Sequence, residues 1–258
     1  MLRARPRARI WLPPVVGLGL IALIWQLVAI HNPYLLPRVP AVFDQLGARP
    51  GLYVRDAGAT LEEVGVGAGV AFAGAFLLAL AMSEIALVEH AVMPLAVALN
   101  VTPVVSIAPA LTVMLGPTTA PRYVVTGIVV FFPVLVNSLV GLRAADPAVV
   151  DVARTLDASR REVLVHVRIP ASLPYLFAAA RICLPLAVVG AVVAEFTTAG
   201  PARGLGALIL TAAQNDDLPT VFAAILVLAF VGVALTLAVT LVERRLLRWH
   251  TSGRRHSS

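Results

Sequence analysis

TVFAAILVLAFVGVALTLAVTLV, residues 220–242, decides the fold class, because this run of 23 residues contains no charged side chain. A helix that rises about 1.5 Å per residue needs about 20 apolar residues to cross a hydrocarbon core about 30 Å thick. Further windows of similar length and character are 10–30, 64–83, 92–115, 123–142 and 175–196, the last interrupted by Arg181. The sequence therefore predicts an all-α, polytopic membrane helix bundle with about six transmembrane helices, since backbone groups inside lipid must be satisfied within each segment.

The composition excludes an ordinary soluble domain. Hydrophobic residues make up 59% and charged residues 13% of the 258 residues, whereas soluble proteins carry about 25% charged residues. All 20 basic residues are arginine, so the lysine of a P-loop nucleotide site or of Schiff-base catalysis is missing. Cys183 is the single cysteine, and the five histidines show no ligand spacing. We therefore expect neither ATP hydrolysis nor a metal or cofactor in this chain.

The arginines predict the orientation in the membrane. Fourteen lie in the tail 1–9, the connection 143–172 and the tail 243–258, and five lie in connections on the opposite side. Because basic residues accumulate in cytoplasmic segments, both termini are expected to be cytoplasmic, in a single domain (1–258) with a helical core (10–242). The first window also resembles a signal peptide, but its length and the lack of a small-x-small cleavage site favour a retained span. Membrane anchoring explains the basic tails more simply than nucleic-acid binding does.

Prolines predict that the third window, 92–115, is a broken helix, since Pro103 and Pro109 each remove a backbone donor inside it. Polar side chains near such bends can either satisfy the freed carbonyl groups or face an aqueous path. Glu195, at the outer end of the fifth window, can likewise line a path or be a hydrated carboxylate at a helix end. The candidate residues of a translocation path are Asn100, Thr102, Ser106, Asn137 and Glu195.

The connection 143–172 predicts two short helices. Asp146-Pro147 is typical of an N-cap followed by proline at the first helical position. Ser159-Arg-Arg-Glu162 has the capping-box pattern, and Pro170 is expected to end the second helix. Helices of about ten residues are marginal in water, so their apolar faces must dock on something. The mixed charge of the polar faces favours a protein socket over the bilayer surface.

The run DVARTLDASRREVLVHVRIP, residues 151–170, resembles the coupling loop of ABC importer permeases. The family pattern is Glu-Ala-Ala, three residues, Gly, nine residues and then Ile-x-Leu-Pro. By this resemblance Asp151 stands for the acidic residue and Asp157 for the glycine, where aspartate tolerates a left-handed turn better than most residues do. The resemblance extends to the nitrate, sulfonate and taurine branch through Phe132-Pro133, Val192-Val-Ala-Glu195 and Gly204-Leu-Gly206.

The resemblance implies a bacterial inner-membrane complex. Its other parts would be a second permease copy in a homodimer, two ATP-binding-cassette ATPases that carry ATP and Mg, and an extracytoplasmic solute-binding protein. Asp151 and Arg154, three positions apart, can instead pair with each other on the helix surface. The residues implied to couple to the ATPase are Asp151, Val152, Ala153, Arg154, Asp157, Ser159, Arg160, Val167, Ile169 and Pro170.

The resemblance implies small organic anions such as sulfonates, taurine or nitrate as the solute, with a neutral heterocycle such as a pyrimidine precursor as the alternative. Two other function classes fit the residues less well. An ion-coupled secondary transporter needs ionisable groups near the midplane of its spans, whereas Arg181 and Glu195 each lie near a window end. An intramembrane enzyme needs a motif such as HExxH or paired aspartates in its spans, which the sequence lacks.

Overall fold

The computed structural model describes residues 8–197 and 203–246, in which every regular element is helical. This confirms the predicted all-α class. A π-helical turn at Leu164–Arg168 joins α8 to α9. The α-helices are α1 (Ala8–His31), α2 (Val39–Ala48), α3 (Pro50–Glu84), α4 (Ala86–Val101), α5 (Val104–Leu115), α6 (Ala120–Arg143), α7 (Pro147–Thr155), α8 (Arg160–Val163), α9 (Ile169–Thr197), α10 (Leu205–Gln214) and α11 (Leu218–Leu246).

Each predicted window falls on helical structure. Among residues 8–197 and 203–246, four helical segments are long and apolar enough to cross a membrane: α3, α6, α11 and the continuous segment Arg160–Thr197. The pair α4 and α5 passes the same test together and makes a fifth, but its two halves meet at a bend of 101°. The third window is therefore broken, as its prolines predict. The first window lies in α1, whose fully described apolar part is Gly19–His31.

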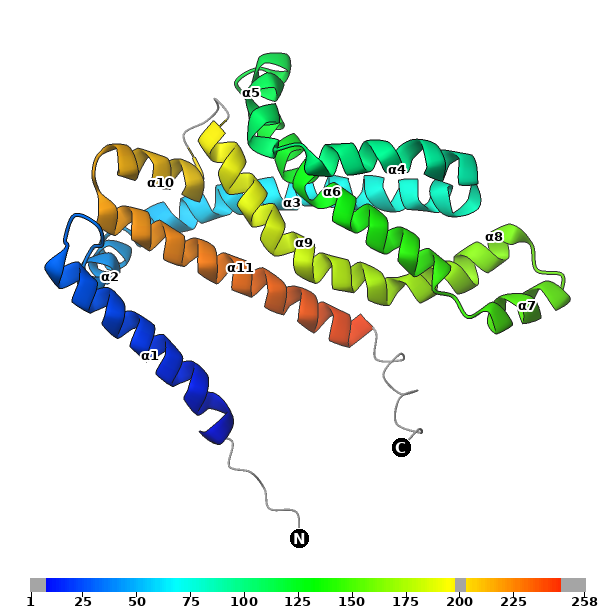
Figure 1. Cartoon of the computed structure of the whole chain (residues 1–258), viewed down its shortest axis with the longest axis horizontal. Coiled ribbons are helices and arrows are strands. Elements are labelled where there is room, and N and C mark those ends of the chain that lie inside the picture. Colours follow the sequence, from blue (N-terminus) through cyan, green and yellow to red (C-terminus); the bar gives the residue numbers. More distant parts are fainter. Residues whose placement is uncertain (1–7, 198–202, 247–258) are drawn as a thin grey trace, which may run out of the picture.

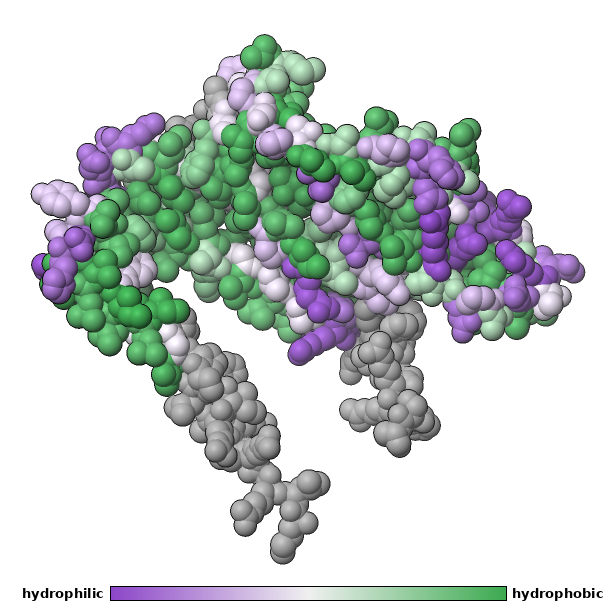
Figure 2. Space-filling view, in the orientation of Figure 1, coloured by the Kyte–Doolittle hydropathy of each residue, from purple (hydrophilic) through white to green (hydrophobic). Residues whose placement is uncertain are grey.

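The helices α3, α6 and α9 form the centre of the bundle. Figure 1 shows them crossing between two ends, one carrying α10 and the other carrying α7 and α8. Alanines of α3 (Ala71, Ala75 and Ala79) face larger residues of α6 such as Leu135. A second apolar cluster, which includes Tyr53, packs α2 and α10 against α11. Figure 2 shows apolar residues over much of the visible bundle and hydrophilic residues gathered at the α7–α8 end, as expected for helices that face lipid.

Close packing of α3 on α6 depends on Gly67. A Cβ atom there would lie 2.6 Å from the carbonyl oxygen of Tyr123 and 2.8 Å from Cβ of Thr126. Gly69 lies two residues further along α3, and a Cβ atom there would have no neighbouring atom within 4 Å. Small residues therefore bring these helices together, as is usual where no hydrophobic drive acts between helices.

Replacing Gly67 by leucine is expected to destabilise the bundle by about 1–3 kcal/mol or more, because the side chain must push α6 away. Thermal unfolding of the purified protein in detergent measures the effect. Gly69→Leu adds the same side chain on the same helix in open space and is the matched control. Equal losses in the two variants would contradict the packing described for Gly67.

Candidate functional site

The helix α7 begins and ends with local caps. Asp146 accepts a hydrogen bond from the backbone N of Ala148 at 2.9 Å, with Pro147 as the first helical residue. At the other end Asp157 has φ of +57°, and Ala158 N donates to the carbonyl of Ala153 at 3.0 Å. This is the hydrogen bond of a Schellman C-cap, in which a left-handed residue ends the helix. The predicted N-cap and the left-handed turn at Asp157 are confirmed.

The second predicted helix begins as expected but does not end as expected. Ser159 N donates to Glu162 at 2.8 Å and Glu162 N donates to Ser159 Oγ at 3.3 Å, which completes the capping box. The prediction that Pro170 ends this helix is wrong, because α8 continues through the π-helical turn into α9. Ile169 N bonds to the carbonyl of Leu164, five residues back. The wider turn accommodates a proline that has no N–H and needs space beside the preceding carbonyl groups.

The apolar side of α7 is uncovered in the described part of the chain. Leu156 is 77% exposed and Val152 is 59% exposed, whereas Val150 on the inner side is buried. Asp151 and Arg154 do pair, at 3.6 Å, but both side chains remain largely exposed. The pairing therefore leaves both residues accessible to a partner.

Two ion pairs hold this segment onto the bundle. Arg168 pairs with Glu84 at 2.7 Å, and Arg143 pairs with Glu89. Both acids lie around the turn between α3 and α4. The positions implied to couple therefore differ in exposure, with the α7 end open and the α9 end half-buried. Exposed are Asp151, Val152, Arg154, Asp157, Ser159 and Arg160, and half-buried are Ala153, Val167, Ile169 and Pro170.

Polar residues gather where α4 and α5 meet. Asn100, Thr102 and Ser106 are all exposed around the 101° bend. The hydroxyl and the backbone N of Thr102 both bond to the carbonyl of Ala98, at 2.8 and 3.1 Å, so this side chain satisfies the backbone locally. The bend itself is open on the surface of the chain.

Asn137 lies apart from that bend, on α6. It is half-buried, and its Nδ2 donates to the carbonyl of Pro133 at 2.8 Å. Pro133 lies inside α6 and has no N–H, so the carbonyl that loses its helical donor is that of Val129, four residues back. Asn137 therefore bonds to the local backbone but does not replace the hydrogen bond that Pro133 removes.

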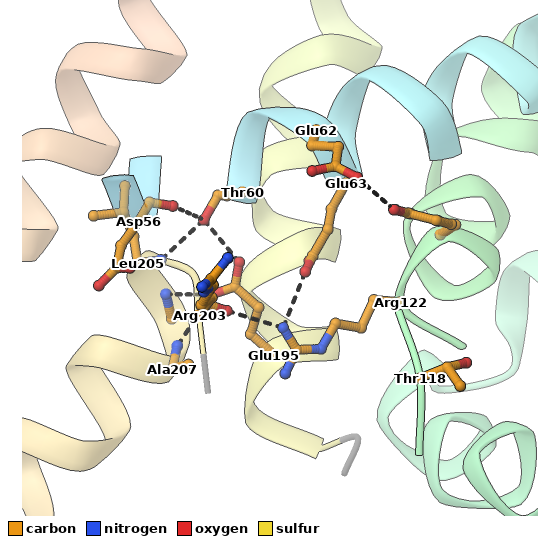
Figure 3. A network of polar contacts seen from close by, with 12 residues as sticks. Asp56, Thr60, Glu62, Glu63, Thr118, Arg122, Glu195, Arg203, Leu205 and Ala207 are labelled. Atoms are coloured by element: carbon orange, nitrogen blue, oxygen red, sulfur yellow. Dashed lines mark hydrogen bonds and ion pairs between the residues drawn. The ribbon is translucent and has the colours of Figure 1, made fainter. Parts of the chain in front are cut away.

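Glu195 lies in a buried polar network at the α10 end (Figure 3) and is 3% exposed. The interpretation of a hydrated helix-end carboxylate is therefore wrong. Its Oε1 accepts from Thr60 Oγ1 at 2.7 Å, and its Oε2 accepts from the backbone N of Gly206 and, at 3.0 Å, of Ala207. Oxygen acceptors satisfy the free N–H groups at a helix N-terminus, so Glu195 caps α10 from another helix.

An ion pair lies beside Glu195. Arg122 of α6 donates to Glu63 Oε1 of α3 at 3.0 Å and to the carbonyl of Arg203 at 3.0 Å. The side chains of Arg122 and Glu63 are 3% and 4% exposed. Thr60, Glu63 and Arg122 are not among the site residues predicted from the sequence. One pattern in the sequence could have indicated the pair of Glu63 and Arg122. Each of them directly precedes an apolar window, and the two windows begin on the same side of the membrane.

Residues 65–248 match a family described as "binding-protein-dependent transport system inner membrane component". The chain belongs to this family. A formylaminopyrimidine transport permease protein of Halalkalibacterium halodurans is 32% identical over 92% of this chain and 96% of its own length. A riboflavin transport system permease protein of Chloroflexus aurantiacus is 37% identical over 64% of this chain and 60% of its own length. A putative aliphatic sulfonates transport permease protein of Bacillus subtilis is 32% identical over 60% and 55%, respectively.

Membership confirms the predicted resemblance. The chain is a multi-pass inner-membrane permease of an ABC importer and is not the subunit that hydrolyses ATP. A binding-protein-dependent permease works with an ATPase and a solute-binding protein. The permease therefore needs at least two protein-binding surfaces, one for each of these partners.

Proposed function

We propose that two copies of the permease form the solute path of an ABC importer and that α7 with α8 docks on the ATPase. The observation that carries this proposal is the uncovered apolar side of α7, a nine-residue helix with caps at both ends. A helix this short is not stable by itself in water. A partner that packs on its apolar side would supply the missing stabilisation. The caps hold the helix ready for that partner at little entropic cost.

The charges at this end fit a protein partner. Asp151 and Arg154 flank the exposed apolar residues and set the register of docking, while the ion pair of Arg168 with Glu84 ties the segment to α3. With this end on the ATPase side, the α7–α8 end and both termini face the cytoplasm. That orientation agrees with the excess of arginine at 1–9, 143–172 and 243–258.

The path is proposed to run past the bend between α4 and α5. Non-helical backbone at membrane depth is tolerated only where protein buries it or water surrounds it. Asn100, Thr102 and Ser106 are exposed at this bend, so lipid is an unsuitable neighbour. A second copy of the permease that faces the bend provides both the cover and the aqueous path.

The solute is proposed to be a neutral nitrogen heterocycle related to pyrimidines rather than an organic anion. The exposed polar side chains at the bend are uncharged amide and hydroxyl groups, which suit the donor and acceptor edge of such a ring. The formylaminopyrimidine permease matches nearly the whole chain, whereas the sulfonates permease matches a shorter part. Both formylaminopyrimidine and riboflavin contain pyrimidine-type rings.

Ligand binding by the solute-binding protein that works with the permease tests the solute class. A thermal-shift panel would contain a formylaminopyrimidine, riboflavin, taurine, an aliphatic sulfonate and nitrate. We expect stabilisation by a pyrimidine-type compound and not by the anions, because a ligand that binds only the folded state raises the unfolding temperature. Stabilisation by taurine or a sulfonate alone would instead establish the organic-anion alternative.

A further inference from the structure

The short helix α10 lies at the end opposite α7 and presents an outer face of mixed polarity, in which Leu210 and Ala213 are exposed beside polar residues. Its ten residues are too few to cross a membrane. Leu205 and Ala212 are buried against the rest of the bundle, whereas Thr211 and Gln214 are exposed. Because the ATPase is proposed to occupy the α7 end, the solute-binding protein is the partner that reaches this face.

The N-terminus of α10 is fastened by the Glu195 latch, which we define as Glu195, Thr60 and the backbone of residues 205–207. Thr60 Oγ1 donates to Glu195 and also accepts from Leu205 N at 2.9 Å. The positive end of the α10 dipole and two N–H groups stabilise the buried carboxylate. The latch therefore joins α3, α9 and α10 through one side chain.

Two glycines at the start of α10 allow its backbone to approach Glu195 closely. Gly204 has φ of +117°, a conformation that side chains with a Cβ rarely adopt. A Cβ atom at Gly204 would overlap the Glu195 carboxyl group, and one at Gly206 would lie 2.6 Å from Glu195 Oε2. These glycines allow the carboxylate to touch the backbone directly, so α10 cannot shift without breaking the latch.

A single helical segment connects the latch to the coupling end. The segment Arg160–Thr197 is continuous over 38 residues, about 57 Å of helix at 1.5 Å per residue. It contains Glu195 near one end and the capping box of α8 at the other. Figure 1 shows it running from the side of α10 to the side of α7. A displacement of α10 therefore acts directly on the helical segment whose other end holds four of the residues implied to couple, Arg160, Val167, Ile169 and Pro170, next to α7.

We propose that Glu195 is a positioning residue: it fastens α10 to this helix, so that docking of the solute-binding protein on α10 is transmitted to the ATPase. This inference rests on the proposed function, since it needs both partners at opposite ends. Glu195 acts through α10 and has no contact with solute. The buried carboxylate is thus assigned to signalling between the two partners rather than to the translocation path.

The test compares variants in the purified complex with the ATPase and the loaded solute-binding protein. The measured quantity is the ratio of ATP hydrolysis with and without the binding protein, at equal amounts of co-purified ATPase. We expect Glu195→Leu to lower this ratio about tenfold, which corresponds to about 1.4 kcal/mol, because three donors lose their acceptor. Glu195→Gln should restore much of the ratio, since its amide oxygen still accepts from Gly206 and Ala207. Thr60→Val removes the shared hydroxyl and should lower the ratio by a smaller factor.

Glu62→Leu is the matched control, because Glu62 is an exposed neighbour on α3 that bonds to Tyr123 outside the latch. An unchanged ratio in Glu195→Leu would overturn the inference, and so would a loss of co-purified ATPase that accounts for the whole effect. If Glu195→Leu does not fold, an unchanged ratio in Thr60→Val has the same meaning. Failure of the proposed function looks different, because the wild-type permease would then co-purify no ATPase.

Discussion

Leu156→Arg is expected to remove most of the ATPase that co-purifies with the permease. Leu156 is 77% exposed, so the substitution costs the isolated permease little. At a docked interface, a buried leucine contributes about 1.5–3 kcal/mol, and each 1.4 kcal/mol is about tenfold in affinity. We therefore expect a loss of about 10- to 100-fold, measured by the amount of ATPase retained per permease on affinity purification.

Leu35→Arg is the control for this substitution. Leu35 is 68% exposed in the connection between α1 and α2, away from the coupling segment, and the change introduces the same charge. It should leave ATPase retention unchanged. Asp151→Arg, a charge reversal at the same surface as Leu156, should weaken retention by a smaller factor. Full retention in Leu156→Arg would show that α7 is not the docking surface.

Arg122→Leu is expected to destabilise the permease by about 3–5 kcal/mol, because breaking a buried ion pair leaves an uncompensated charge. Glu63 is 4% exposed, and its Oε2 has no hydrogen-bond partner in the described part of the chain. The midpoint of denaturation in detergent micelles measures the effect.

The double variant Glu63→Leu with Arg122→Leu distinguishes the cost of an unpaired buried charge from the cost of lost packing. Removing both charges should recover most of the lost stability, since an apolar pair of similar volume can replace a buried ion pair. Arg181→Leu breaks the more exposed pair with Glu243 and should cost about 1 kcal/mol or less. A double variant as unstable as Arg122→Leu alone would contradict this interpretation of the pair.

Local chemistry made the helix caps in the connection 143–172 predictable. The N-cap at Asp146 and the capping box of Ser159 and Glu162 involve residues no more than three positions apart, and the structure contains both. The left-handed turn at Asp157 also depends on one residue and its neighbours. Such contacts form with little loop-closure entropy, so their sequence patterns are reliable.

Pro170 shows where a local rule gives the wrong answer. Proline usually ends or kinks a helix, yet here α8 and α9 are continuous. A π-helical turn makes room for the proline ring within the continuous helix, and the ion pair of Arg168 with Glu84 holds this turn against α3. Packing against other helices can thus outweigh the cost of one missing hydrogen bond.

By itself the sequence determined that this protein is an all-α membrane bundle with a broken span and with capped helix N-termini in the connection 143–172. Those properties follow from the length of apolar runs and from contacts between near neighbours in the chain. Only the tertiary structure decided that Glu195 meets Thr60 and α10, and that Arg122 meets Glu63. These partners come from different helices. Which charged groups face each other depends on how the helices pack and how each is rotated about its axis, and the positions of the apolar windows do not specify this.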